Sequence, residues 1–68
     1  MAIGKVKWFN IAKGYGFIQP DDGGKDVFVH ISAVEKSGLT SLPEGAKISY
    51  DLMIGRNGKQ LAEHLRIG

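Results

Sequence analysis

Two short segments in which rings alternate with other side chains constrain the fold most strongly. They span residues 15–19 (Tyr-Gly-Phe-Ile-Gln) and residues 26–30 (Asp-Val-Phe-Val-His). Successive side chains of a β-strand point to opposite faces, so Ile18, Val27 and Val29 would share one face and form a core. The opposite face would then carry four rings: Tyr15, Phe17, Phe28 and His30. A small protein seldom exposes several rings side by side unless something binds there.

Lysines are interleaved with these rings and with Trp8 and Phe9 in the first 28 residues. They are Lys5, Lys7, Lys13 and Lys25. Flat π-faces with positive charge around them suit unpaired nucleic-acid bases, which stack on the rings while the phosphates meet the lysines. The net charge is only +2, from nine Lys and Arg against seven Asp and Glu. The placement of the charges, more than their number, therefore indicates a polyanionic partner.

Length and composition exclude several classes of protein. Sixty-eight residues make one small domain, residues 1–68, without room for a deep catalytic cavity beside its core. Cysteine is absent, which excludes disulfides, thiolate metal sites and thiol nucleophiles. No apolar run has the length of a signal peptide or of a membrane span, which needs about 20 residues. We expect a cytoplasmic monomer that uses no cofactor, membrane or small-molecule substrate.

Three further segments read as strands. They span residues 3–10, 46–54 and 60–67, and a helix is the competing interpretation of the last one. Alternation in the second of them places Ile48, Tyr50 and Leu52 on one apolar face. The pair Asn57-Gly58 favours a type I′ turn between the last two strands.

The remaining segments read as connections. Residues 10–14 and 20–24 are turns, residues 31–34 could form one helical turn, and residues 35–45 form a loop in which leucines can pack. Five short strands joined mostly by turns predict an all-β fold, a five-stranded antiparallel barrel. Closing the barrel would also remove the exposed edges that endanger a small sheet.

The orientation of Trp8 and Phe9 stays open on the pattern alone. Strict alternation places Trp8 on the same face as Val6, in the core. The two neighbouring rings cannot both face one way without a twist or a β-bulge.

The whole chain resembles the cold-shock domain family. The blocks at residues 7–10, 13–18 and 26–30 are similar to its signature, the second and third of them to its two RNP motifs. Residues 32–34 and 42–45 match the family pattern in order and spacing. The resemblance implies an OB-type barrel that binds single-stranded RNA and DNA, and an RNA chaperone that loosens RNA secondary structure without ATP.

The resemblance also implies which residues contact nucleic acid, and it favours exposure of Trp8. The expected set is Lys7, Trp8, Phe9, Asn10, Lys13, Tyr15, Phe17, Asp26, Phe28, His30, Ile31 and Arg56. Ile31 stands where many members have Phe, and Leu39 where many have an aromatic residue, so stacking should be weaker at that end. Residues 59–65 depart from the usual ending, which leaves open the register of the last hairpin and the role of Arg56.

Two other functions compete with nucleic-acid binding. One is a small adaptor that docks a peptide on its aromatic patch. The other is an enzyme built on His30, but no Ser, Cys or Asp arrangement supports that residue as a general base. Two histidines without further ligands do not make a metal site. We therefore expect no catalytic residue and no metal.

Overall fold

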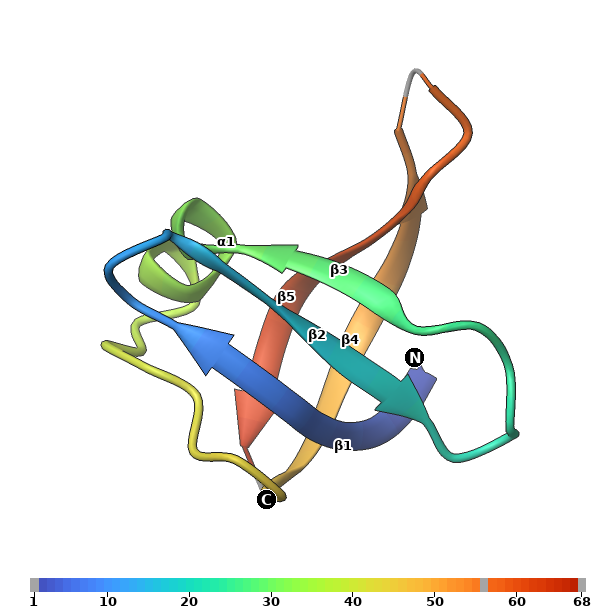
Figure 1. Cartoon of the computed structure of the whole chain (residues 1–68), viewed down its shortest axis with the longest axis horizontal. Helices are drawn as coiled ribbons and strands as arrows, with labels where there is room; N and C mark the ends of the chain where they lie inside the picture. The colour runs from blue at the N-terminus through green and yellow to red at the C-terminus, as the bar shows by residue number, and fades with distance from the viewer. Residues whose placement is uncertain (1, 56, 68) are drawn as a thin grey trace.

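Five strands and one short helix follow one another along the chain in the computed structural model, which describes residues 2–55 and 57–67 (Figure 1). The elements are β1 (Ala2–Asn10), β2 (Tyr15–Pro20), β3 (Val27–His30), α1 (Ile31–Lys36), β4 (Lys47–Ile54) and β5 (Gln60–Ile67). The five predicted strands are confirmed, and the last segment is a strand and not a helix. The predicted helical turn is the start of α1, which continues to Lys36.

The strands form a closed barrel in the order β1-β2-β3-β5-β4. Four of the pairings are antiparallel, and the fifth, between β3 and β5, is parallel, with Phe28 opposite Leu61. The parallel pairing arises because α1 and the loop after it carry the chain from β3 across the barrel, whereas the antiparallel neighbours β1-β2, β2-β3 and β4-β5 are joined by short turns. The predicted five-stranded barrel is confirmed.

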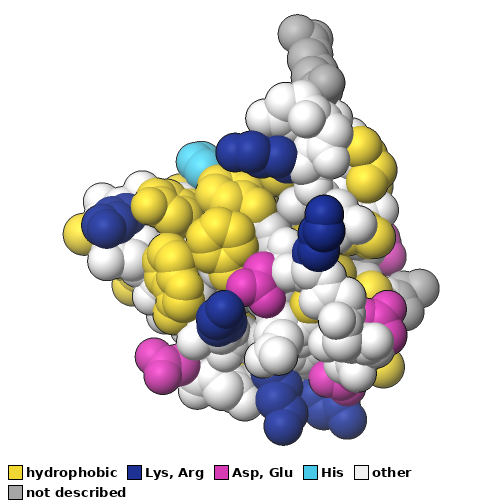
Figure 2. All heavy atoms as spheres, turned by 45° about the vertical axis from the view of Figure 1, so that its right-hand side comes forward, with side chains coloured by type: hydrophobic (Ala, Val, Ile, Leu, Met, Phe, Trp, Pro, Cys, Tyr) yellow, Lys and Arg dark blue, Asp and Glu magenta, His cyan; other side chains and the backbone are white. Residues whose placement is uncertain are grey.

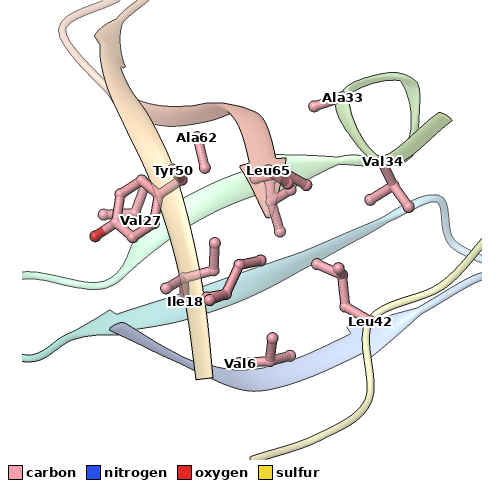
Figure 3. Close-up of a cluster of buried hydrophobic side chains, with 11 residues drawn as sticks. Val6, Ile18, Val27, Ala33, Val34, Leu42, Tyr50, Ala62 and Leu65 are labelled. Carbon is pink, nitrogen blue, oxygen red and sulfur yellow. The ribbon is translucent and has the colours of Figure 1, made fainter. Parts of the chain in front are cut away.

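The barrel interior is filled by aliphatic side chains from every strand, with one phenol among them (Figure 3). Ile18, Val27 and Val29 are buried, as the alternation predicts. α1 adds Ala33 and Val34. The long loop after the helix buries Leu42 and packs Leu39 against the core, so this end of the barrel is covered.

Leu52 does not join the core, although alternation places it on the same face as Ile48 and Tyr50. Its side chain is 45% exposed, whereas the other two are buried. The pairing of β1 with β4 reaches only as far as Ala2 opposite Tyr50. Beyond that point β5 still pairs with β3, at Leu61 opposite Phe28, but no described residue of β1 lies beside β4, so Leu52 stays exposed.

The connection between β4 and β5 runs from Gly55 to Lys59, as the predicted strand bounds imply, but it is not built on the predicted type I′ turn. Ile54 pairs with Gln60, and the connection is closed by hydrogen bonds from Gly55 N–H to the Lys59 carbonyl (2.8 Å) and from Gly58 N–H to the Gly55 carbonyl (3.0 Å). A type I′ turn needs positive φ at both of its central residues. Gly58 has it (φ 80°), but the hydrogen bond from Gly58 N–H to the Gly55 carbonyl closes a turn that begins one residue earlier than a turn centred on Asn57-Gly58 would. The predicted type I′ turn is therefore wrong, while the predicted hairpin is right.

Tyr50 is the buried phenol, and it gives the fold a dependence on alkaline pH. Burial, followed by the negative charges of Asp22 and Asp21, raises the pKa of its hydroxyl above the ordinary value of 10.0. The fold favours the protonated phenol. Its contribution to stability is therefore fully present below pH 10.0 and is lost as the pH rises from there through the raised pKa of the folded state.

We expect the free energy of unfolding of the wild type to fall above pH 10.0 more steeply than that of Tyr50→Phe. One titrating group contributes at most about 1.4 kcal/mol per pH unit to this difference. Urea titrations of the two proteins at a series of pH values measure it. Equal alkaline losses in both proteins would assign the effect to other groups.

Candidate nucleic-acid interface

A β-bulge in β1 decides where Trp8 points. Val6 pairs with Ile18, and Trp8 pairs with Phe17. Between these two pairs β1 advances by two residues and β2 by only one, so Lys7 is an extra residue on β1. Val6 therefore faces the core with Ile18, and Trp8 faces outward with Phe17. The bulge reverses the alternation after Val6, so Trp8 lies on the outer face, as the family resemblance implies and strict alternation does not.

Phe9 lies on the other face. It pairs with Gly16, is partly buried and packs against the core cluster. A Cβ atom on Gly16 would meet the Trp8 carbonyl oxygen and lie 2.7 Å from both Cα and Cδ1 of Phe9. Glycine is therefore needed at position 16 because β1 and the Phe9 ring approach its backbone too closely for any side chain.

Five rings from three strands form one contiguous surface, which we call the aromatic platform: Trp8, Tyr15, Phe17, Phe28 and His30. The registers place Phe17 opposite Phe28 and Tyr15 opposite His30. The Trp8 ring lies 5.4 Å from Phe17 and 5.6 Å from Tyr15, both edge to face. The rings of Tyr15 and Phe28 are stacked at 5.5 Å. The platform therefore holds its rings against one another without any ligand.

The platform faces solvent and not the core. The side chains of Trp8, Tyr15, Phe17 and Phe28 are each partly exposed, and His30 is exposed. Figure 2 shows a patch of hydrophobic side chains with a histidine at its border, and smaller hydrophobic areas apart from it. The predicted exposure of the rings is confirmed, and ring faces are left available on the outside of the barrel.

His30 has a structural task that the sequence did not indicate. It is the N-cap of α1, and its Nδ1 accepts a hydrogen bond from the backbone N–H of Ser32 at 3.1 Å. The Ser32 hydroxyl lies 2.9 Å from the same nitrogen. The neutral ring must then carry its proton on Nε2. His30 is thus oriented to present an N–H donor and a flat face at the edge of the platform.

Lysines surround the platform, and one of them is already paired. Lys7 Nζ lies 2.8 Å from Asp26 Oδ2, and both side chains are exposed. Such a pair contributes little to stability, and a phosphate can compete with the carboxylate for Lys7. Lys13, Lys25 and Lys59 make no ion pair with any residue in the described ranges. Figure 2 shows Lys and Arg side chains on several sides of the patch.

A groove of about 370 Å³ extends the platform toward the β4–β5 connection. We call it the hairpin groove, and its lining residues are Phe17, Lys25, Asp26, Phe28, Gly58, Lys59 and Gln60. Lys59 and Gln60 were missing from the residues expected to bind, because the register of this hairpin was open. The signal that could have found them is the departure from the family ending at residues 59–65.

The other expected residues lie around the platform. The Asn10 side chain accepts a hydrogen bond from Lys13 N–H at 3.0 Å and so shapes the turn between β1 and β2, where Gly14 has φ 82°. Ile31 is partly buried at the start of α1, beside His30. Arg56 lies outside the described residues, so its predicted contact stays a prediction.

The chemistry of this surface is that of a binding site. Exposed ring faces can stack on planar groups, Nε2 of His30 can donate, and the lysines can meet anions. In residues 2–55 and 57–67 no group of three or more His, Cys, Asp or Glu side chains is placed to hold a metal ion. His64, the second histidine, lies 3.1 Å from Asp51 on the neighbouring strand. No helix in the described part of the chain is long and apolar enough to cross a membrane.

Comparisons with known proteins point in the same direction. Residues 2–67 match the family model described as "'Cold-shock' DNA-binding domain". The chain is 63% identical over 67 residues to the probable cold shock protein y4cH of Sinorhizobium fredii, and 58% identical over 67 residues to cold shock protein CspA of Rhizobium meliloti. Each alignment covers 97% of both chains. Cold shock-like protein CspE of Escherichia coli is 49% identical over 59 residues, which cover 87% of this chain and 86% of that protein.

Proposed function

Because the chain belongs to the "'Cold-shock' DNA-binding domain" family, we propose that it binds single-stranded RNA and DNA with little sequence preference and acts as an RNA chaperone. The family consists of nucleic-acid binders and not of enzymes, so the partner of the chain is a nucleic acid. The preference for unpaired strands, the inclusion of RNA and the chaperone activity are the parts that we propose.

One observation carries the proposal: the aromatic platform is contiguous, exposed and surrounded by lysines. Bases inside a duplex are stacked on each other and cannot offer their faces to Phe17 or Phe28. Bases of a single strand can stack on such rings, each contributing about 1–3 kcal/mol. Every base has a π-face, so this mode of binding tolerates many sequences.

Polar groups at the border would orient the strand. Nε2–H of His30 can donate to a base or phosphate oxygen. Asp26 can accept from base N–H groups once a phosphate has taken its place beside Lys7. Along the hairpin groove, Lys25 and Lys59 are placed to neutralise phosphates as the strand passes Phe28.

The chaperone activity follows from mass action. A protein that binds the open form of an RNA hairpin and not its paired form shifts the equilibrium toward the open form by RT ln(1 + [protein]/Kd). At a protein concentration 100 times the Kd for the open strand, this amounts to about 2.7 kcal/mol. Binding energy alone drives the opening, so ATP is not needed.

We also propose that the chain does this as a cytoplasmic monomer, because the platform is complete within one copy.

An RNA hairpin with a fluorophore and a quencher at its ends tests this function. Adding the protein without ATP should raise the fluorescence to a plateau and lower the melting temperature of the hairpin as the protein concentration rises. Phe17→Ala, which removes one platform ring, should need a higher concentration for the same effect. An unchanged melting temperature at concentrations that saturate a single strand of the same sequence would contradict the chaperone activity while leaving binding intact.

A further inference from the structure

A second cavity opens at the end of the barrel where β1 begins. It has a volume of about 380 Å³, and we call it the end cavity. Its lining residues are Ala2, Ile3, Pro20, Asp21, Asp22, Gly24, Lys25, Val27, Tyr50, Leu52 and Gln60. None of the five platform rings is among them. The end cavity shares Lys25 and Gln60 with the hairpin groove, but its other lining residues have no part in the proposed nucleic-acid binding.

A core residue directs a polar group into this cavity. Tyr50 is only 1% exposed, yet it lines the end cavity. Its hydroxyl makes no hydrogen bond with the described residues, although no buried side-chain oxygen or nitrogen among them is sealed without a partner. The Tyr50 side chain therefore brings a polar group to the lining of the cavity. In Figure 3 the hydroxyl points away from the other core side chains.

Carboxylates lie at the same opening. Asp21 and Asp22 line the end cavity, and their charges act on the Tyr50 hydroxyl, as the direction of its pKa shift indicates. Neither carboxylate forms an ion pair within the part of the chain that the structure describes. Lys25 is the one cation among the lining residues, so the lining is net negative on a chain whose total charge is positive.

The cavity adjoins a strand edge without a partner. In the described ranges β4 pairs with β1 only up to Tyr50, so the following residues of β4 have β5 on one side and no strand on the other. Alternate residues of that segment turn backbone N–H and C=O groups toward the open side. After Asp51, the last three residues of this segment carry exposed apolar side chains: Leu52 at 45%, Met53 at 49% and Ile54 at 64%.

We propose that this end of the barrel binds an extended segment of a partner protein that carries a lysine or arginine. The segment adds as a strand to the open edge of β4, and its apolar side chains cover Leu52 and Ile54. Its basic side chain enters the end cavity with its apolar stem against Ile3. Its charged head reaches Asp21 and Asp22 and donates to the Tyr50 hydroxyl oxygen. Because the platform is not involved, a partner and a nucleic acid can be bound together.

A fluorescein-labelled peptide of alternating valine and lysine is the probe, and fluorescence anisotropy measures its affinity. We expect saturable binding to the wild type and at least tenfold weaker binding to the double variant Asp21→Asn, Asp22→Asn. A peptide with glutamate in place of lysine should bind at least tenfold more weakly. A lysine peptide N-methylated on the amides that would pair with β4 should lose binding, because it cannot add as a strand. Glu35→Gln, a charge change on α1 away from the cavity, is the control and should bind like the wild type.

A competition experiment distinguishes this surface from the platform. Saturating oligothymidine should leave the peptide bound, and the amide resonances that shift on adding peptide should be those of Ile3 and Leu52 and not that of Trp8. Displacement of the peptide by oligothymidine would overturn the proposal. So would equal binding of the acidic peptide, unchanged binding to the double aspartate variant, or no binding of the lysine peptide at all. None of these outcomes bears on the proposed binding of single strands.

Discussion

Replacing Phe28 with alanine is expected to weaken the binding of a short oligothymidine about 5- to 150-fold, with the barrel still folded. This range corresponds to the loss of one stacked base, about 1–3 kcal/mol. Phe28 lies at the centre of the platform, 5.5 Å from the Tyr15 ring and 5.7 Å from the Phe17 ring. Removing it also takes away a neighbour that holds those two rings in place. Its side chain is not part of the buried core cluster, so the fold should survive.

Two measurements check this result together. Titration with oligothymidine gives the affinity, and thermal unfolding followed by circular dichroism shows whether the variant is folded at the temperature of the titration. Met53→Ala is the matched control, because Met53 is an exposed apolar residue on β4 outside the platform and the hairpin groove. Its affinity should equal that of the wild type. A folded Phe28→Ala protein with wild-type affinity would mean that bases do not stack on this ring.

Raising the salt concentration tenfold is expected to lower the affinity for a single strand by two to three orders of magnitude. Each phosphate that is neutralised contributes about −0.7 to the slope of log K against log salt for a single strand. Lys25 and Lys59 line the hairpin groove, Lys7 pairs with Asp26 of that groove, and Lys13 lies in the turn before Tyr15. If each neutralises one phosphate, the slope is about −2.8. Titrations across a series of salt concentrations measure the slope directly.

A lysine that the family pattern did not predict gives this experiment its sharpest variant. Lys59→Gln should make the slope less steep by about 0.7, because one phosphate loses its partner. Lys36→Gln, at the end of α1 and outside the groove, should leave the slope unchanged. A slope near zero for the wild type would mean that contacts between lysines and phosphates do not contribute to binding. A wild-type slope near about −2.8 that Lys59→Gln does not alter would mean only that the strand makes no phosphate contact with Lys59 in the hairpin groove.

Alternation predicted the centre of this structure because β2 and β3 are regular strands. In both strands, aliphatic side chains occupy one set of alternate positions and rings occupy the other. Ile18, Val27 and Val29 could therefore be assigned to the core and the rings to the outside. The same alternation did not predict the face of Trp8, because a bulge at Lys7 inserts one residue into β1. A bulge changes the face of every residue after it, and it depends on the pairing of two strands, which a pattern within one strand does not contain.

The far half of the chain was less predictable for similar reasons. Leu52 has the position of a core residue in the alternation, but burial also needs an opposing strand, and the described residues of β1 do not extend to that level. The Asn57-Gly58 pair favours a turn centred on those two residues, whereas the hydrogen bond from Gly58 N–H to the Gly55 carbonyl closes a turn that begins one residue earlier. Because the register of this hairpin was open, the sequence did not place Lys59 and Gln60 beside Phe17 and Phe28, where the structure has them.

The fluorescence of Trp8 offers the most direct test of the central claim, that rings on the outer face of the barrel stack on unpaired bases. Trp8 is the only tryptophan in the chain, so its signal reports on the platform alone. Oligothymidine should quench the emission to saturation at one strand per protein, and a blunt-ended duplex of equal length should cause little change at the same concentrations. Emission that no oligonucleotide alters, or that duplex and single strand quench equally at the same concentrations, would contradict the claim.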